Sequence, residues 1–203
     1  MVQSLLEKIV QNKNHHAKWL NSLSFLENCG ARKISKSEHR SDVDIMVLKH
    51  AAEEHRHAFY LKKMISRVDQ NTCLTYRDEE LLGLYGTKHY LHKLDIFTSK
   101  YLSKKLNLSG NDLKYMAYLL VTYAIEVRAD ELYPVYQKVL KKAKSKVSVY
   151  TIIKEEEGHL EEMIVSLNKR LVGWEKHAEI IQEYEHELFQ VWIGAIQEEI
   201  ESV

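Results

Sequence analysis

The sequence has very few of the residues that usually interrupt helices. Its 203 residues include a single proline and only seven glycines, and long stretches contain neither. Proline and glycine are the residues that most disfavour a helix interior, whereas Glu, Lys, Leu and Ala are plentiful. The composition argues against a chain rich in turns and predicts a nearly all-helical protein.

Cysteine and long apolar runs are also scarce. Cys29 and Cys73 are the only cysteines, which is too few for a disulfide framework, and they do not form a metal-type pair. No apolar run approaches the ~18 residues that a membrane span requires, and the N-terminal segment turns polar after about ten residues. We therefore expect a reduced, cytoplasmic protein without a membrane partner.

Neither sign of charge dominates. The chain carries 29 basic and 29 acidic residues, and its formal net charge is zero. Without excess positive charge there is no global field to attract phosphate backbones, so no nucleic-acid partner is expected. The length and the 45% hydrophobic content suit one compact domain spanning residues 1–203.

Apolar residues recur at helical spacing along most of the chain. We expect Gly30 to interrupt the first helix near its end, Ser41 or Asp42 to cap the second helix, and Gly83 and Gly86 to break a long crossover segment. The predicted ranges are 3–34, 42–66, 112–144 and 148–170 for four core helices, 67–111 for the crossover and 174–203 for an additional C-terminal helix.

A Glu-x-x-His pattern occurs three times, where 22 glutamates and 11 histidines in 203 residues give roughly one by chance. Side chains three residues apart lie on one face of a helix and can reach one metal ion. Two of the pairs share the side of the core-facing apolar residues, whereas the third should be solvated. The inward pairs are Glu54 with His57 and Glu156 with His159, and the third is Glu183 with His186.

Two further glutamates lie in apolar stripes. Glu27 precedes Glu54 by 27 residues, and Glu126 precedes Glu156 by 30 residues. A buried, unpaired carboxylate costs several kcal/mol or shifts its pKa, so each needs a cation, a metal or a hydrogen-bonded network. The same order occurs twice: a helix with one inward Glu, followed by a helix with an inward Glu-x-x-His.

In this ordered pattern the chain resembles the ferritin-like di-metal carboxylate proteins, whose bundle supplies one Glu from each of two helices and Glu-x-x-His from the other two. The resemblance covers roughly residues 10 to 170 and implies a ferritin-like four-helix bundle with a helical crossover. It further implies two metal ions, of which iron is favoured and manganese or zinc are alternatives. The implied ligands are bridging Glu54 and Glu156, terminal Glu27 and Glu126, and His57 and His159.

The pattern departs from rubrerythrin, because Ala129 stands where an extra carboxylate is common and no segment with four cysteines is present. A heme-oxygenase-like di-iron fold is another helical alternative. A core of satisfied polar residues without metal is the simplest competing interpretation. Neighbours that could support the ligands are His50, Tyr123 and Asp130, although His50 suits an ordinary hydrogen bond, Tyr123 suits packing and Asp130 suits a surface ion pair.

The resemblance implies an oxidoreductase that activates O₂ or peroxide and acts on a small-molecule substrate. The alternatives are a non-enzymatic iron-handling or peroxide-scavenging protein and a bundle whose metal serves only stability. An apolar tunnel ending at the metals would favour the enzyme. Trp174 and Trp192 are expected to be exposed, which suggests a homodimer.

Overall fold

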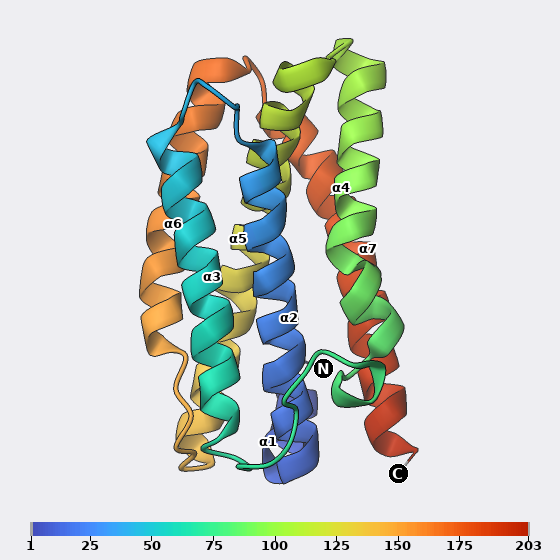
Figure 1. Ribbon diagram of the computed structural model, residues 1–203. Helices are drawn as coiled ribbons and strands as arrows, with labels where there is room; N and C mark the ends of the chain where they lie inside the picture. The colour runs from blue at the N-terminus through green and yellow to red at the C-terminus, as the bar shows by residue number, and fades with distance from the viewer. Residues whose placement is uncertain (1, 203) are drawn as a thin grey trace.

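The computed structural model describes residues 2–202, and this part of the chain is all-helical, as the composition predicts (Figure 1). It contains seven α-helices, one short 3₁₀ helix and no strand. The helices are α1 (Val2–Gln11), α2 (Lys13–Ser37), α3 (Ile45–Ile65), η1 (Asp78–Glu80), α4 (Leu84–Leu106), α5 (Gly110–Lys142), α6 (Tyr150–Arg170) and α7 (Glu175–Glu201).

The helices form two antiparallel pairs joined by a long connection. Helices α2 and α3 pack together, as do α5 and α6, and α2 also contacts α5. Helix α4 carries the chain back along the bundle, so α3 and α5 run in the same direction (Figure 1). Helix α7 packs against α4 and α5, which makes α4 and α7 an additional layer beside the four site-bearing helices.

Three predicted boundaries are wrong, each for a local reason. The first helix divides at Asn12, whose side chain accepts a hydrogen bond from the His15 backbone N–H at 3.1 Å and caps α2. Gly30 does not interrupt α2, which continues to Ser37. The N-cap of α3 is Asp44, which accepts from the Met46 N–H at 2.9 Å, and not Ser41 or Asp42.

The two crossover glycines have different roles. Gly83 adopts a left-handed φ of 56° immediately before α4, a conformation that favours glycine. Gly86 lies inside α4, where a Cβ atom would come within 2.9 Å of the Trp192 Cα atom. The break predicted at Gly86 is therefore wrong: this glycine permits close contact between α4 and α7.

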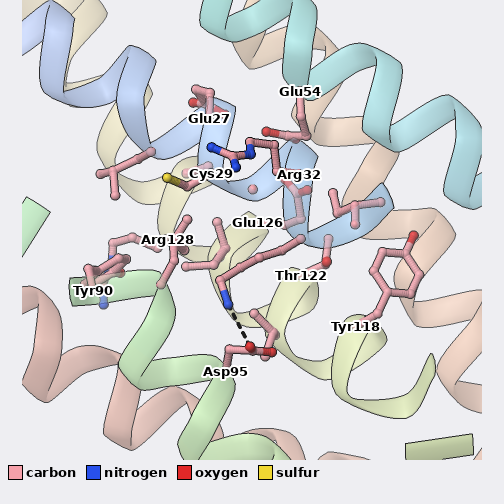
Figure 2. Close-up of a pocket in the computed structure, with 18 of the residues that line it drawn as sticks. Glu27, Cys29, Arg32, Glu54, Tyr90, Asp95, Tyr118, Thr122, Glu126 and Arg128 are labelled. Atoms are coloured by element: carbon pink, nitrogen blue, oxygen red, sulfur yellow. Dashed lines mark hydrogen bonds and ion pairs between the residues drawn. The ribbon is translucent and has the colours of Figure 1, made fainter. Parts of the chain in front are cut away.

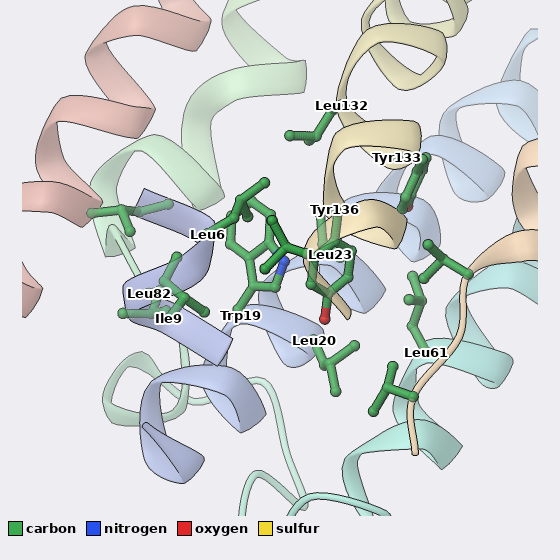
Figure 3. Packing of buried hydrophobic residues seen from close by; sticks show 14 of the residues in the cluster. Leu6, Ile9, Trp19, Leu20, Leu23, Leu61, Leu82, Leu132, Tyr133 and Tyr136 are labelled. Carbon is green, nitrogen blue, oxygen red and sulfur yellow. The ribbon is translucent and has the colours of Figure 1, made fainter. Parts of the chain in front are cut away.

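Buried apolar residues form two clusters, one toward each end of the bundle. The first includes Trp19, Leu20, Leu61 and Tyr136 (Figure 3). Helices α2, α3, α5 and α6 each place apolar residues in both clusters. On each helix, the predicted ligands lie between the residues of the first cluster and those of the second. The flanking pairs are Leu23 and Ile34, Ala51 and Leu61, Ala124 and Leu132, and Ile152 and Met163.

Not every apolar residue at helical spacing is buried. Val43, which precedes α3, is exposed, and so are Ile180 and Val191 on α7. Trp174 and Trp192 are buried, 6% and 2% exposed, so neither supplies the surface on which the homodimer prediction was based. None of the described helices combines the length and apolarity needed to cross a membrane.

Candidate metal centre

The bundle brings all six predicted ligands together. Five of them are buried, Glu27 is partly buried, and they form groups that could hold a metal ion. The first group is Glu27, Glu54, His57 and Glu156, and the second is Glu54, Glu126, Glu156 and His159. Within each group, one candidate ligand atom per residue lies within 4.8 Å of all the others.

Two carboxylates belong to both groups. Glu54 on α3 and Glu156 on α6 are shared, whereas Glu27 and Glu126 each belong to one group. A carboxylate has two oxygens, so a shared glutamate can offer one oxygen to each of two neighbouring ions. The grouping agrees with the division into bridging and terminal carboxylates that the resemblance implies.

Each imidazole turns one nitrogen toward the carboxylates and the other toward a glutamate outside the set. His57 Nδ1 lies 3.0 Å from Glu156 Oε1, and its Nε2 lies 2.7 Å from Glu155 Oε2. His159 Nδ1 lies 3.1 Å from Glu156 Oε2, and its Nε2 lies 2.7 Å from Glu53 Oε2. A neutral ring that donates from Nε2 in this way presents its Nδ1 lone pair to the cluster.

The contacts of the two imidazoles with Glu155 and Glu53 are reciprocal between α3 and α6. Glu53 directly precedes Glu54 on α3 and accepts from the histidine of α6, while Glu155 directly precedes Glu156 on α6 and accepts from the histidine of α3. Arg56 holds Glu155 through a 2.6 Å ion pair. The two Glu-Glu-x-x-His segments thus orient each other's imidazoles.

In the metal-free protein, protons supply positive charge at the site. Burial alone would lower the pKa of both imidazoles, but the facing carboxylates outweigh it. The Glu156 carboxylate, whose Oε1 lies 3.0 Å from His57 Nδ1, raises the pKa of His57 to about 9, with further attraction from Glu27. Glu126 and Glu156 raise the pKa of His159 to about 11.

The pKa values of the clustered carboxyl groups are shifted in opposite directions. Burial and repulsion from Glu27 and Glu156 raise the pKa of Glu54 well above its ordinary value, and burial with repulsion from Glu156 does the same for Glu126. Burial would also raise the pKa of Glu156, but the hydrogen bonds from Glu126 and His159 and the nearby His57 imidazole hold it below the ordinary value. Carboxylates this close cannot all ionise without a cation.

Two buried atoms of the cluster have no hydrogen-bond partner, namely His57 Nδ1 and Glu126 Oε2. His57 Nδ1 is close to Glu156, but the atoms are not aligned for a hydrogen bond. Unpaired buried polar atoms are rare and costly, and coordination to a metal would satisfy both. Mixed carboxylate and imidazole ligands suit iron or manganese, and zinc also accepts them.

Of the three residues predicted to support the ligands, His50 lies beside the cluster, whereas Tyr123 and Asp130 do not contact it. His50 lies beside the site: its ring centroid is 4.5 Å from that of His159, and its Nε2 lies 2.8 Å from Glu162 Oε2. Tyr123 instead packs edge-on against Trp174, and Asp130 is exposed. Among residues 2–202, no hydrogen bond or ion pair joins Tyr123 or Asp130 to the cluster, so the structure gives neither of them the supporting role considered above.

The third Glu-x-x-His pair is solvated, as predicted from its helical face. Glu183 and His186 are both exposed on α7. The buried acid on that helix is Glu185, which forms an ion pair with Arg128 (2.8 Å) and accepts a hydrogen bond from Tyr90. Sequence analysis did not single out Glu185, although its position among Ile181, Leu188 and Phe189 marks the apolar face.

Three contacts of the site were missed from the sequence. Buried Tyr133 on α5 donates a hydrogen bond to Glu27, and its register two turns after Glu126 could have indicated this. Glu53 and Glu155 were missed because they lie at the edges of their helix faces, where acidic residues are normally solvated. The available signal was that a second glutamate directly precedes the glutamate of each inward Glu-x-x-His pair.

A cavity of about 620 Å³ opens beside the cluster, between α2, α4 and α5 (Figure 2). Its wall includes all four carboxylates and neither imidazole. Gly30 lines it next to Glu54, where a Cβ atom would lie 3.7 Å from Glu54 Oε2. The carboxylate side of the site can therefore be reached from the cavity, while His57 and His159 are only 2% and 1% exposed.

Comparison with protein-family models, curated proteins and solved structures finds no match for this chain.

Proposed function

We propose that the chain is a ferritin-like di-metal protein that binds two iron ions and acts as an oxidoreductase on a small substrate, using O₂ or peroxide. The observation that carries the proposal is the pair of four-residue groups that share Glu54 and Glu156. Isolated buried acids are normally neutralised by one partner. Here four glutamates and two histidines converge from four helices, in the order expected of such a centre.

The residues themselves have defined tasks in this proposal. Glu54 and Glu156 would hold both ions, Glu27 and Glu126 one ion each, and the two imidazoles would bind through Nδ1. Glu53 and Glu155 keep the rings in that orientation by accepting their Nε2 protons. When bound, a pair of ferrous ions supplies electrons to O₂ or peroxide, which carboxylate and imidazole side chains cannot do themselves.

The cavity supports an enzyme over iron handling. It reaches the four carboxylates and is lined near them by apolar side chains such as Leu23, Val121 and Leu132. A site that only stores or oxidises iron has no need of an apolar chamber of this size, whereas substrate pockets are concave, largely apolar and of 300–1,000 Å³.

Metal content and oxygen reactivity test the proposal together. The protein is reconstituted anaerobically with Fe(II), desalted and subjected to elemental analysis, then exposed to O₂ while optical spectra are recorded. We expect about two irons per chain and new near-ultraviolet absorption that develops only after O₂ is admitted.

The chain offers a matched control for this test. Glu54→Ala with Glu156→Ala should reduce bound iron to below half an ion per chain, while Glu183→Ala with His186→Ala, at the exposed Glu-x-x-His, should leave it unchanged. Circular dichroism checks that each variant is folded. Fewer than about one iron per wild-type chain, or equal iron in both double variants, contradicts the site assignment.

A further inference from the structure

The cavity beside the cluster changes character from its inner end to its mouth. Close to the four carboxylates its wall is largely apolar, with Leu23, Val121, Ile125, Ala129 and Leu132 among the lining residues. Farther along α2 and toward the N-terminus of α5, the lining includes Arg32, Lys33, Lys36 and Lys114 and becomes basic. A molecule that fills the cavity therefore meets two different environments.

Three basic side chains of this mouth have no carboxylate partner. Arg32 and Lys36 on α2 and Lys114 on α5 are exposed, and no ion pair involves them within residues 2–202. The remaining mouth lysine, Lys33, pairs with Asp95 at 2.6 Å. The mouth consequently has a net positive charge, although the whole chain is neutral.

Ordinary helix electrostatics does not account for this arrangement. Lys36 lies in the last turn of α2, where a cation balances the helix dipole. Arg32 stands one turn earlier and Lys114 comes from a different helix, so the dipole of α2 explains neither. Arg128 also lines the cavity, but Glu185 binds it through two hydrogen bonds, so it is not available to a ligand.

Helix geometry gives the distance between the mouth and the cluster. At 1.5 Å per residue, Arg32 lies about 8 Å and Lys36 about 14 Å beyond Glu27 along α2. An extended hydrocarbon chain advances roughly 1.3 Å per carbon, given ordinary C–C bond lengths. A chain of roughly six to ten carbons spans this distance.

We propose that the cavity binds an amphipathic monocarboxylate of this length, such as a medium-chain fatty acid, with its carboxylate at Arg32, Lys36 and Lys114. The apolar body then extends inward, and the end far from the carboxylate lies against the metal-binding cluster. This assignment of a substrate class rests on the proposed function, whereas the binding itself does not require metal.

Calorimetric titration with decanoate tests the binding, on both metal-free and iron-loaded protein kept anaerobic. Decanol, which has the same chain without the charge, serves as the comparison ligand. Replacing three cations, Arg32→Gln, Lys36→Gln and Lys114→Gln, should weaken decanoate binding at least tenfold and change decanol binding less than twofold. The matched control removes three exposed lysines at the other end of the bundle, Lys138→Gln, Lys141→Gln and Lys146→Gln, and should leave both affinities unchanged.

A cavity-filling variant locates the bound chain. Val121→Phe narrows the apolar part of the cavity without touching a mouth cation, so it should reduce the affinity for decanoate and decanol alike while iron content stays the same. Circular dichroism confirms the fold of every variant. An unchanged decanoate affinity in the triple mouth variant overturns the proposal, and so does tighter binding of octyl phosphate than of decanoate.

The two proposals can fail separately. Decanoate binding without retained iron removes the di-metal function and leaves the carboxylate site in place. Two retained irons without decanoate binding remove the substrate assignment alone.

Discussion

At the scale of single residues, the position of Glu53 and Glu155 explains how two imidazoles can be held with one nitrogen facing inward. Each glutamate is next in sequence to a candidate ligand, yet it contacts the histidine of the opposite helix. Residues adjacent in a helix point about 100° apart, so one can enter the cluster while the other reaches across the interface. Such outer contacts set the tautomer and basicity of a ligand histidine.

Removing these contacts should weaken metal binding without removing a ligand. We expect Glu155→Gln or Glu53→Gln to lower iron affinity 10- to 100-fold, measured by competition with a chromophoric chelator. Glu157→Gln is the matched control, because Glu157 is exposed and its ion pair within residues 2–202 is with Lys154 on the same helix. Equal affinities in all three variants would show that the glutamates do not orient the rings.

His16 is a second residue with a measurable effect, here on stability against pH. It is buried, its Nε2 lies 2.7 Å from the Tyr136 hydroxyl, and burial lowers its pKa from 6.5 to about 4. Between these values the unfolded chain binds the proton and the folded chain does not, so the free energy of unfolding falls as pH falls from 6.5 to 4. The loss is about 3 kcal/mol at 1.36 kcal/mol per pKa unit.

Urea unfolding at a series of pH values measures this contribution. His16→Gln should flatten the pH dependence between 6.5 and 4 relative to the wild type, whereas His89→Gln, at an exposed position on α4, should not. A wild-type slope retained in the His16 variant assigns the pH dependence to other groups.

At the scale of elements, a buried ion pair fastens α7 to the rest of the molecule. Glu185 on α7 binds the guanidinium of Arg128 on α5, with distances of 2.9 and 2.8 Å, and also accepts from Tyr90 on α4. The Arg128 guanidinium lies over the Phe189 ring, 4.1 Å from its centroid. One acid therefore joins three helices, and this contact also forms part of the cavity wall.

Breaking this contact should be costly. We expect Glu185→Ala to lower the free energy of unfolding by about 3 kcal/mol, because it removes the buried partner of a largely buried guanidinium and leaves the exposed Glu131 as the ion-pair partner of Arg128. Glu183 is exposed and lies two residues before Glu185 on the same helix. Glu183→Ala should change the free energy of unfolding by less than about 0.5 kcal/mol. Urea denaturation measures the free energy of unfolding of both variants. Similar losses in the two variants would show that α7 is held by apolar packing alone.

Most of the helices could be predicted from the sequence, because periodicity and the lack of breakers act locally. What failed were features determined by a distant neighbour. The sequence predicts a helix break at Gly86, yet the glycine is explained by its close contact with Trp192, which lies far along the chain. Trp174 and Trp192 were expected on a surface because nothing local shows that α4 and α5 cover them.

The candidate ligands could be predicted for the opposite reason. Acidic residues on an apolar helix face conflict with burial, so Glu27, Glu54, Glu126 and Glu156 are conspicuous in the sequence itself. Tyr123 and Asp130 are predicted as supporting residues only from their spacing along one helix. Such spacing indicates the approximate face of a residue but not its contacts: Tyr123 packs against Trp174, and Asp130 is exposed.

At the scale of the whole molecule, the cluster lies between two apolar cores and joins the four helices that surround it. Without metal, the cost of burying its carboxylates is offset only by protonation and mutual hydrogen bonds. A bound cation that contacts groups from four helices should therefore stabilise the entire bundle.

The melting temperature measures this coupling. Free Fe(II) at 100 times its dissociation constant, kept anaerobic, should add about 2.7 kcal/mol, which raises the melting temperature by roughly 5–10 °C for a domain of this size. Excess chelator should reverse the rise. The Glu54→Ala, Glu156→Ala variant should show no shift, and a comparable shift in that variant would place the binding elsewhere.

The division of the ligands between two helix pairs also has a consequence for biosynthesis. Glu27, Glu54 and His57 are translated first, while Glu126, Glu156 and His159 follow only after the long connection through α4. A nascent chain that ends before α6 lacks Glu156 and His159, and its His57 lacks the contact with Glu155. Under the proposed function, we therefore expect the metal to load late, into an already assembled bundle, through the opening between α2, α4 and α5.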